Sequence, residues 1–310
     1  MRRFWVVLAV ISTVSLVGAT ARVASAAPVG AGYWLEAGDG GVFAFGTPFE
    51  GSAASDPTRC PANPPDRAMP NGSCWSSAPT PDGGGYWIVN AYSGDVYTYG
   101  DAGYYGQPAD TGAYSGGADL WPTALAIVAT PDGKGYWVLE EGLIGIGSVQ
   151  AFGDAVDYGD EVTIARTTGH VGVPVAMAAT SDGGGYWIVD SDGGVFSFGD
   201  AGFYGSMGGT RLNAPVVGMA VTPDGKGYWL AASDGGVFSF GDATFGGSMA
   251  GTRLAKPVVG IAANASGTGY WLAAADGGVF ALGGAPFLGS MGGKALARPV
   301  FAISAKPSMG

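Results

Sequence analysis

Residues 222–248 read TPDGKGYWLAASDGGVFSFGDATFGGS, and the rest of the chain repeats this stretch. The tripeptide GYW occurs six times, with its tyrosine at Tyr33, Tyr86, Tyr136, Tyr186, Tyr228 and Tyr270. Successive tyrosines are 42 to 53 residues apart. A period of this size, with several short strand-like runs in each repeat, is typical of a propeller or a related array.

One repeat contains alternating strand-like runs and turns. Residues 215–222 are apolar, residues 223–227 (PDGKG) have the composition of a tight turn, and YWLAAS follows. Residues 237–241 (VFSFG) alternate large and small side chains with the period of a strand. We expect four short antiparallel strands per repeat, the fourth formed by TFGGS at 244–248. Because no segment has helical spacing over a useful length, the sequence predicts an all-β protein.

The two ends of the repeat array are complementary. The first repeat begins at Tyr33 without a preceding first strand, and a spare first strand, PVFAISA, stands at Pro299–Ala305. We therefore predict a six-bladed β-propeller of residues 27–310, closed by pairing the C-terminal strand into the first blade. Closure would remove the exposed sheet edges of an open array. A seven-bladed or irregular ring is the alternative, and we expect a monomer.

Residues 1–26 have the features of a secretory signal peptide. Arg2 and Arg3 precede an apolar run at 4–17, and Ala24-Ser25-Ala26 forms a small-residue cleavage site. We expect the mature chain to begin at Ala27 and to be secreted. No second apolar stretch of membrane length follows, so we expect no membrane insertion after the signal is removed.

The charge of the mature chain restricts its partners. Residues 27–310 carry eleven basic and 25 acidic residues, a net charge of −14. Nucleic acids require lysine and arginine for their phosphates, so the composition disfavours a nucleic-acid ligand and an anionic membrane.

Cysteine and histidine usage argues for a disulfide and against a metal. Cys60 and Cys74 flank a proline-rich loop, and in an oxidising compartment we expect them to pair. The chain has one histidine, His170, so zinc sites of the usual composition cannot be formed. We expect no cofactor.

The GYW…DGGVFSFGDA…GS unit resembles tandem-repeat propeller segments of exported bacterial proteins. This resemblance covers nearly all of the mature chain and implies the architecture without implying an activity. Residues 80–87 and 180–187 both read T-x-D-x-G-x-Y-W, which is similar to the Asp box of sialidase-like propellers. In those families the box is a folded turn distant from the chemistry, so the likeness implies shape.

Carboxylate pairs are the main catalytic option, since a glycosidase needs only two. Most aspartates recur at equivalent turns of several repeats and are better explained as turn formers. The non-repeated acids are the stronger candidates: Glu36, Glu50, Glu140, Glu141, Asp157, Asp160 and Glu161. A sialidase-like carbohydrate-active hydrolase using such residues is the alternative function.

The leading hypothesis is a secreted, non-catalytic binding or scaffold propeller whose partner is an extracellular glycan, polymer or protein. Its candidate ligand-binding residues are Arg211, Arg253 and Lys294, in the related sequences GTRL, GTRL and GKAL between repeats. These bases are expected on one face of the ring, where they could hold an anionic ligand. The aromatic residues of GYW are interpreted as core between blades, and Trp75 and Trp121 as better candidates for stacking on sugar.

Overall fold

The computed structural model describes residues 31–54, 75–111, 123–142, 146–168 and 172–307. In this part, the protein is all-β, with six three-stranded antiparallel sheets. In the order inner, middle and outer strand, the sheets are: sheet 1, β18 (Val300–Ala305), β1 (Tyr33–Ala37) and β2 (Val42–Phe45); sheet 2, β3 (Trp75–Pro79), β4 (Gly85–Asn90) and β5 (Val96–Gly100); sheet 3, β6 (Thr123–Ala129), β7 (Gly135–Glu141) and β8 (Gly147–Gly153); sheet 4, β9 (Pro174–Ala179), β10 (Gly185–Asp190) and β11 (Val195–Gly199); sheet 5, β12 (Val216–Val221), β13 (Gly227–Ala232) and β14 (Val237–Gly241); sheet 6, β15 (Val258–Ala263), β16 (Gly269–Ala274) and β17 (Val279–Gly283).

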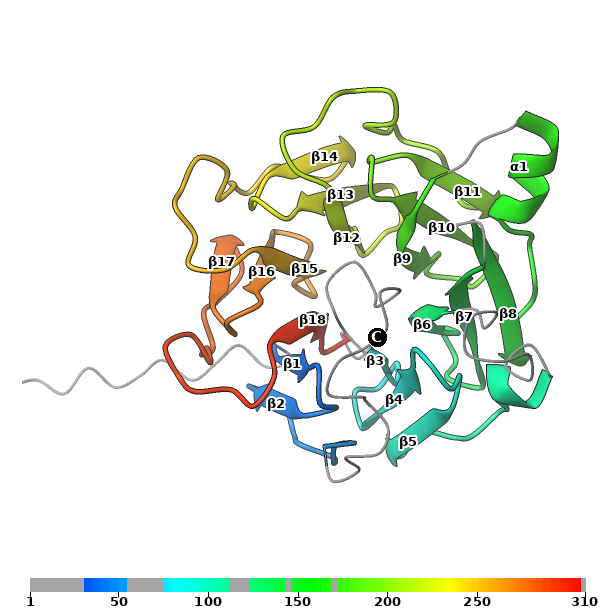
Figure 1. Cartoon of the computed structure of the whole chain (residues 1–310), viewed down its shortest axis with the longest axis horizontal. Coiled ribbons are helices and arrows are strands. Elements are labelled where there is room, and N and C mark those ends of the chain that lie inside the picture. Colours follow the sequence, from blue (N-terminus) through cyan, green and yellow to red (C-terminus); the bar gives the residue numbers. More distant parts are fainter. Residues whose placement is uncertain (1–30, 55–74, 112–122, 143–145, 169–171, 308–310) are drawn as a thin grey trace, which may run out of the picture.

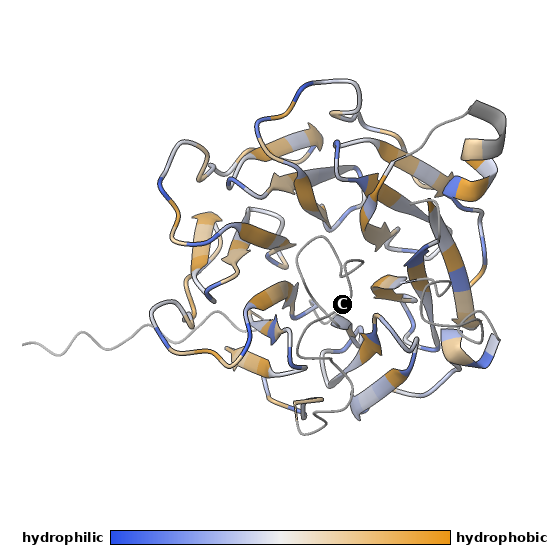
Figure 2. Cartoon of the chain, in the orientation of Figure 1, coloured by the Kyte–Doolittle hydropathy of each residue, from blue (hydrophilic) through white to orange (hydrophobic). Residues whose placement is uncertain are grey.

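The six sheets follow one another around a common centre (Figure 1). The inner strands β3, β6, β9, β12, β15 and β18 each lie against the next, and β18 also lies against β3. Apolar residues concentrate in the strands, and polar residues concentrate in the turns and connections (Figure 2). This arrangement is consistent with a propeller.

Sheet 1 combines strands from distant parts of the sequence. The C-terminal strand β18 pairs antiparallel with β1, placing Ala305 opposite Tyr33 and Ile303 opposite Leu35. The predicted pairing of the C-terminal strand into the first sheet is therefore confirmed. It supplies the inner strand that the first repeat lacks in sequence.

The tryptophan and tyrosine of each GYW motif are buried between neighbouring sheets, as the sequence predicts. The Trp187 ring of sheet 4 lies 6.0 Å from the Tyr228 ring of sheet 5, and the Trp229 ring lies 5.5 Å from the Tyr270 ring of sheet 6. The same contact occurs at all six junctions, the others being Trp34–Tyr86, Trp87–Tyr136, Trp137–Tyr186 and Trp271–Tyr33. These pairs bury large apolar rings where two sheets meet.

The predicted fourth strand is wrong, because each sheet has three strands in the described residues. The segment 244–248 bonds to aromatic side chains instead of extending the sheet. Trp229 Nε1 donates to Thr244 O at 2.9 Å, and the Tyr270 hydroxyl donates to Gly247 O at 2.6 Å. Two glycines, Gly246 and Gly247, let this segment approach the next sheet closely.

A short helix, α1 (Glu161–Thr168), also departs from the prediction that nothing is helical. It lies in the longer tail of the third repeat. Asp160 precedes it and accepts a 3.1 Å hydrogen bond from the Thr163 N–H, which satisfies one of the donors at the helix start. A 3-10 turn, η1 (Pro108–Thr111), follows β5.

Several predictions fall outside the described residues. They concern the signal peptide at 1–26, the Cys60–Cys74 disulfide, His170 and Trp121.

Candidate binding surface

Three connections of equal length join the sheets in the second half of the chain. We call residues 200–215, 242–257 and 284–299 the outer connections. They join β11 to β12, β14 to β15 and β17 to β18, and each extends to the periphery before returning to an inner strand (Figure 1).

Each outer connection is fixed to a β-hairpin of its own sheet. The N–H of Met249 donates to Gly235 O at 2.9 Å, and that of Val258 donates to Ser233 O at 2.9 Å. Gly235 has a φ of +84°, and a Cβ there would lie 2.6 Å from the Met249 Cβ. The hairpin glycine is therefore required for this close approach. Corresponding Met N–H bonds join Met207 to Gly193 and Met291 to Gly277.

These bonds place the second half of each outer connection, from Met207, Met249 and Met291 onward, at the same end of the strands. We call this end, where hairpins join the middle and outer strands, the hairpin face. A half-buried leucine in each connection packs into the apolar core: Leu212, Leu254 and Leu296. The connections therefore present their polar side chains from a fixed backbone.

Arg211 and Arg253 are exposed on this face, and Lys294 is exposed with them. Within the described part of the chain, neither arginine forms an ion pair, and the Lys294 Nζ lies 3.9 Å from the Met291 sulfur. The structure corrects one detail of the alignment. The N–H of Lys294 bonds to Met291 O as the N–H of Thr252 bonds to Met249 O, so Lys294 matches Thr252 and lies one residue before the arginine position.

Two further bases, Lys256 and Arg298, lie in the same connections. Residues 201–215, 243–257 and 284–299 contain five bases and no aspartate or glutamate. The adjoining hairpins add four aspartates: Asp190, which is buried, and Asp192, Asp234 and Asp276. On a strongly acidic chain, the hairpin face of sheets 4 to 6 therefore has a local excess of positive charge.

The opposite end of the strands carries acidic turns. Thr80 donates its hydroxyl to Asp82 Oδ1 at 2.8 Å, and Asp101 Oδ1 lies 3.1 Å from the same hydroxyl. Hydrogen bonds from the Gly84 N–H and the Thr80 hydroxyl lower the pKa of the Asp82 carboxyl. The arrangement recurs at Thr130, Thr180 and Thr222. Here the two lysines are ion-paired, Lys134 with Asp132 at 2.9 Å and Lys226 with Asp224 at 3.3 Å.

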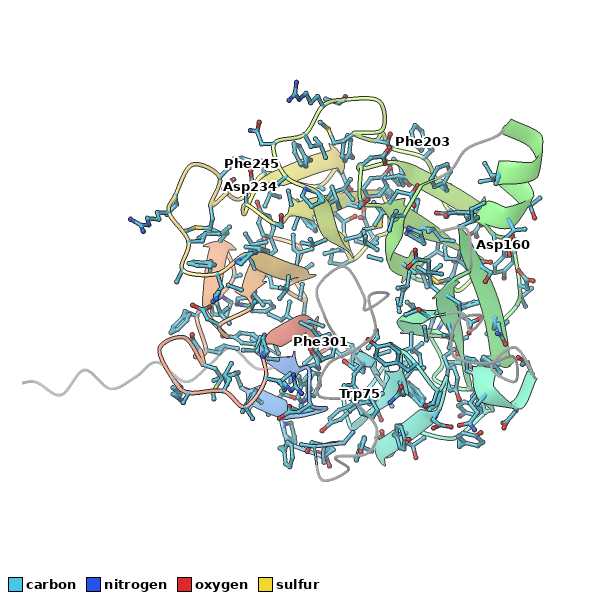
Figure 3. The ribbon with its side chains drawn as sticks, viewed as in Figure 1. Trp75, Asp160, Phe203, Asp234, Phe245 and Phe301 are labelled. Atoms are coloured by element: carbon cyan, nitrogen blue, oxygen red, sulfur yellow. The ribbon has the colours of Figure 1, made fainter. Side chains whose placement is uncertain are left out.

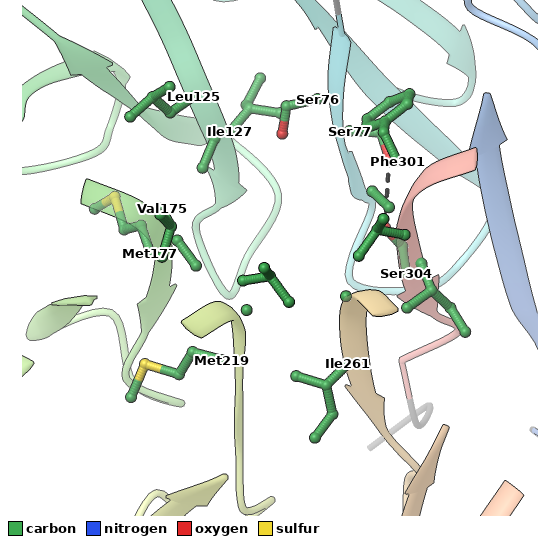
Figure 4. A pocket seen from close by; sticks show the side chains of 18 residues that line it. Ser76, Ser77, Leu125, Ile127, Val175, Met177, Met219, Ile261, Phe301 and Ser304 are labelled. Atoms are coloured by element: carbon green, nitrogen blue, oxygen red, sulfur yellow. Dashed lines mark hydrogen bonds between the residues drawn. The ribbon is translucent and has the colours of Figure 1, made fainter. Parts of the chain in front are cut away.

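A cavity of about 170 Å³ lies between the inner strands of all six sheets (Figure 4). Its wall is mainly apolar and includes Leu125, Met177, Met219 and Ile261. Polar side chains enter it from sheets 1 and 2, and among the described residues its lining includes no carboxylate. None of the non-repeated acids is among the described residues that line this cavity.

A buried carboxyl lies behind the polar side chains that enter the cavity from sheets 1 and 2. Glu36 of β1 is 3% exposed, and the Ser77 hydroxyl of β3 donates to its Oε1 at 2.7 Å. The Ser304 hydroxyl of β18 lies 3.3 Å from that of Ser77. Burial raises the pKa of the Glu36 carboxyl to about 7, and the serine hydroxyls offset part of the increase.

Three of the other non-repeated acids lie around the start of β8, where Glu141 pairs with Gly147, Glu140 pairs with Ser148, and Glu161 bonds to Gly147. Glu140 is buried and accepts a 2.6 Å hydrogen bond from Gln150 Nε2. Glu161 is buried near Asp190 and accepts a 2.9 Å bond from the Gly147 N–H. Burial, with a contribution from the Asp190 charge, raises the pKa of Glu161 to about 8. These contacts fix the Glu140 carboxyl in sheet 3 and the Glu161 carboxyl between α1 and the start of β8.

The sugar-stacking prediction for Trp75 is wrong. Its side chain is fully buried, 5.7 Å from the Tyr97 ring, and lies near the inner strands (Figure 3). The exposed aromatics are instead members of the repeat that the sequence reasoning did not single out: Phe49, Tyr104, Phe203, Phe245 and Phe287. Each of them stands two residues before a glycine of the repeat, and this constant spacing was the available signal.

No family model matches this chain, and no curated protein is significantly similar to it. Among the described residues, no helix is long and apolar enough to cross a membrane. The same residues include no group of three or more His, Cys, Asp or Glu side chains suited to hold a metal ion.

Proposed function

We propose that the protein is a secreted, non-catalytic binding or scaffold propeller of six blades, closed by β18, which binds an anionic extracellular polymer at its hairpin face. The observation that carries the proposal is the set of exposed bases on the outer connections. Arg211 and Arg253 occupy equivalent positions in neighbouring sheets and have no carboxylate partner among the described residues.

The repetition of the site favours a ligand that also repeats. Equivalent bases on adjacent sheets can engage successive charges of one polymer, and each later contact is then intramolecular. A single exposed charge pair contributes little, about 0.2–1 kcal/mol, so several such pairs are needed for useful affinity.

The test replaces Arg211, Arg253 and Lys294 together with alanine. Affinity for polygalacturonate and for inorganic polyphosphate is measured by titration calorimetry at low and high salt. We expect a loss of roughly tenfold at low salt and a smaller loss at high salt, where the attraction is screened.

The matched control removes Lys134 and Lys226, which are exposed but ion-paired on the opposite face. This variant should bind like the parent. Unchanged affinity of the triple variant for both polymers, with an intact fold, would refute this assignment of the site.

A further inference from the structure

One serine interrupts an apolar ring of side chains around the central cavity. Ser77 of β3 pairs with Ile88, the residue after the GYW motif of sheet 2. At the same register, the inner strands of the other five sheets carry isoleucine or methionine: Ile127, Met177, Met219, Ile261 and Ile303. All six side chains line the cavity. Figure 4 shows Ser77 and Ser304 on one side of the cavity and Met177 and Met219 on the other.

Two positions beside Ser77 depart from the repeat in the same way. Ser304 pairs with Trp34, and the residues paired with the other five motif tryptophans are Ala78, Val128, Ala178, Ala220 and Ala262. Glu36 stands three residues after Tyr33, and the residues at this place in the other sheets are Val89, Leu139, Val189, Ala231 and Ala273, all fully buried. Apolar residues therefore satisfy the fold at each of these positions.

The three departures from the repeat meet at one place. The Ser77 hydroxyl donates to Glu36 Oε1 at 2.7 Å, and the Ser304 hydroxyl lies 3.3 Å from that of Ser77. Glu36 Oε2 is buried and has no hydrogen-bond partner among the described residues. We call Glu36, Ser77 and Ser304 the polar corner. Burying such groups costs free energy that an apolar residue would not cost, so their convergence beside a cavity calls for an explanation outside the fold.

The polar corner has more acceptors than donors. Ser77 has committed its only hydroxyl proton to Glu36, so towards the cavity its oxygen can only accept. An ionised carboxyl accepts alone, and a protonated one adds a single donor to several free lone pairs. A ligand that donates a hydrogen bond therefore complements the corner, and a ligand that only accepts does not.

The rest of the cavity sets the size and character of the ligand. Its volume is about 170 Å³, and the wall opposite the corner includes Met177 and Met219. An engineered apolar cavity of about 150 Å³ is large enough for benzene. Methionine side chains adapt to the shape of an apolar partner.

We propose that the central cavity binds a small molecule with an apolar body and one hydrogen-bond-donating group, with the donor at the polar corner and the body against Met177 and Met219. This site is independent of polymer binding at the hairpin face.

The test uses three probes of similar size that share a phenyl ring. Benzyl alcohol can donate a hydrogen bond, benzonitrile can only accept one, and toluene can do neither. Binding is followed by NMR of isotope-labelled methionine methyl groups. Met177 and Met219 report on the cavity, and Met249, which is not part of its lining, is the control.

We expect benzyl alcohol to shift the Met177 and Met219 signals saturably and to leave Met249 in place. Its affinity should exceed that of benzonitrile by roughly tenfold, because benzonitrile leaves the corner without a donor. Equal affinities of the parent for benzyl alcohol and benzonitrile, or a preference for benzonitrile, would overturn the proposal. Signals of Met177 and Met219 that no probe moves would show that the cavity is not a ligand site.

A triple variant gives the corner the apolar character of the other sheets: Glu36→Leu, Ser77→Ala and Ser304→Ala. Leucine and alanine already occupy equivalent positions in the array, and no buried carboxyl is left without its serine partner. A circular dichroism melt confirms that the variant folds. It should bind benzyl alcohol roughly tenfold more weakly than the parent and bind toluene at least as well. A preference for benzyl alcohol that survives these changes would refute the role of the corner.

The comparison of probes on the parent needs no variant, so it decides the proposal even if the triple variant does not fold. The outcome is also distinct from that of the polymer titrations, because the substitutions at Arg211, Arg253 and Lys294 leave the cavity lining unchanged.

Discussion

The ring of Tyr33 lies 5.1 Å from the ring of Trp271, and the Tyr33 hydroxyl donates a 2.6 Å hydrogen bond to Gly289 O. These two contacts join sheet 1 to sheet 6. Tyr228 joins sheet 5 to sheet 4 in the same way, through the Trp187 ring and Gly205 O. The junction between the first and sixth sheets is therefore made by the same ring contact and hydrogen bond as the junction between sheets 4 and 5.

Replacing Tyr33 with phenylalanine should lower the free energy of unfolding by about 1 kcal/mol, because the Gly289 carbonyl loses its donor. Urea denaturation measures the change. Tyr228→Phe is the matched control and should cost a similar amount. A loss for Tyr228→Phe with none for Tyr33→Phe would mean that the junction of sheets 1 and 6 does not form in solution.

Deleting residues 299–310 should leave sheet 1 without its inner strand. The exposed edge of β1 is then free to pair with other chains, so we expect aggregation or loss of the cooperative melt. Deleting only residues 308–310, which follow β18, is the control. If the longer deletion melts cooperatively at the parent temperature, β18 is dispensable.

Glu36 should make the protein less stable as the pH rises. Its pKa is about 7 in the folded state against an ordinary value of 4.5. Between these values the folded protein retains a proton that the unfolded chain has released, so the free energy of unfolding falls by about 3 kcal/mol across this interval. Glu36→Gln, which cannot ionise, should remove this decline.

The pH dependence is measured by urea denaturation from pH 4 to pH 8. Glu161→Gln provides a comparison, because the raised pKa of Glu161, about 8, predicts a separate decline that continues to higher pH. Parallel stability profiles for the parent and Glu36→Gln would show that Glu36 titrates normally.

Cys60 and Cys74 are expected to form a disulfide if the proposed secretion places them in an oxidising compartment. Closing a loop of this length should stabilise the fold by about 3 kcal/mol in the chain-entropy model. Intact-mass measurement with thiol labelling under non-reducing conditions detects the bond. Two labelled thiols would disprove it.

The periodicity of the sequence predicted the strands that bury side chains on both faces. GYW followed by VFSF specifies the middle and outer strands of a sheet, and both are present in sheet 5. The absence of the predicted fourth strand could not be recognised from residues 244–248 themselves. Residues 244–248 find their partners in the Trp229 indole and the Tyr270 hydroxyl, which local alternation cannot reveal.

The candidate sites, like the strands, could be predicted from the sequence only in part. Arg211 and Arg253 could be selected because their repeat positions are equivalent. The placement of Lys294 was off by one residue because GKAL was aligned by composition, whereas the turn that begins at Met291 sets the register. Glu36, Ser77 and Ser304 come from three strands that meet only when β18 joins sheet 1. No local sequence pattern therefore predicts this cluster.

The position of β18 has a consequence for folding during synthesis. A nascent chain that includes β1 and β2 but does not yet include β18 presents an unpaired inner edge for as long as the intervening five sheets are being made. Unpaired edges are the surfaces through which growing chains associate wrongly. Under the proposed secretion, translocation of the chain in an unfolded state would postpone the exposure of this edge until its partner strand is available.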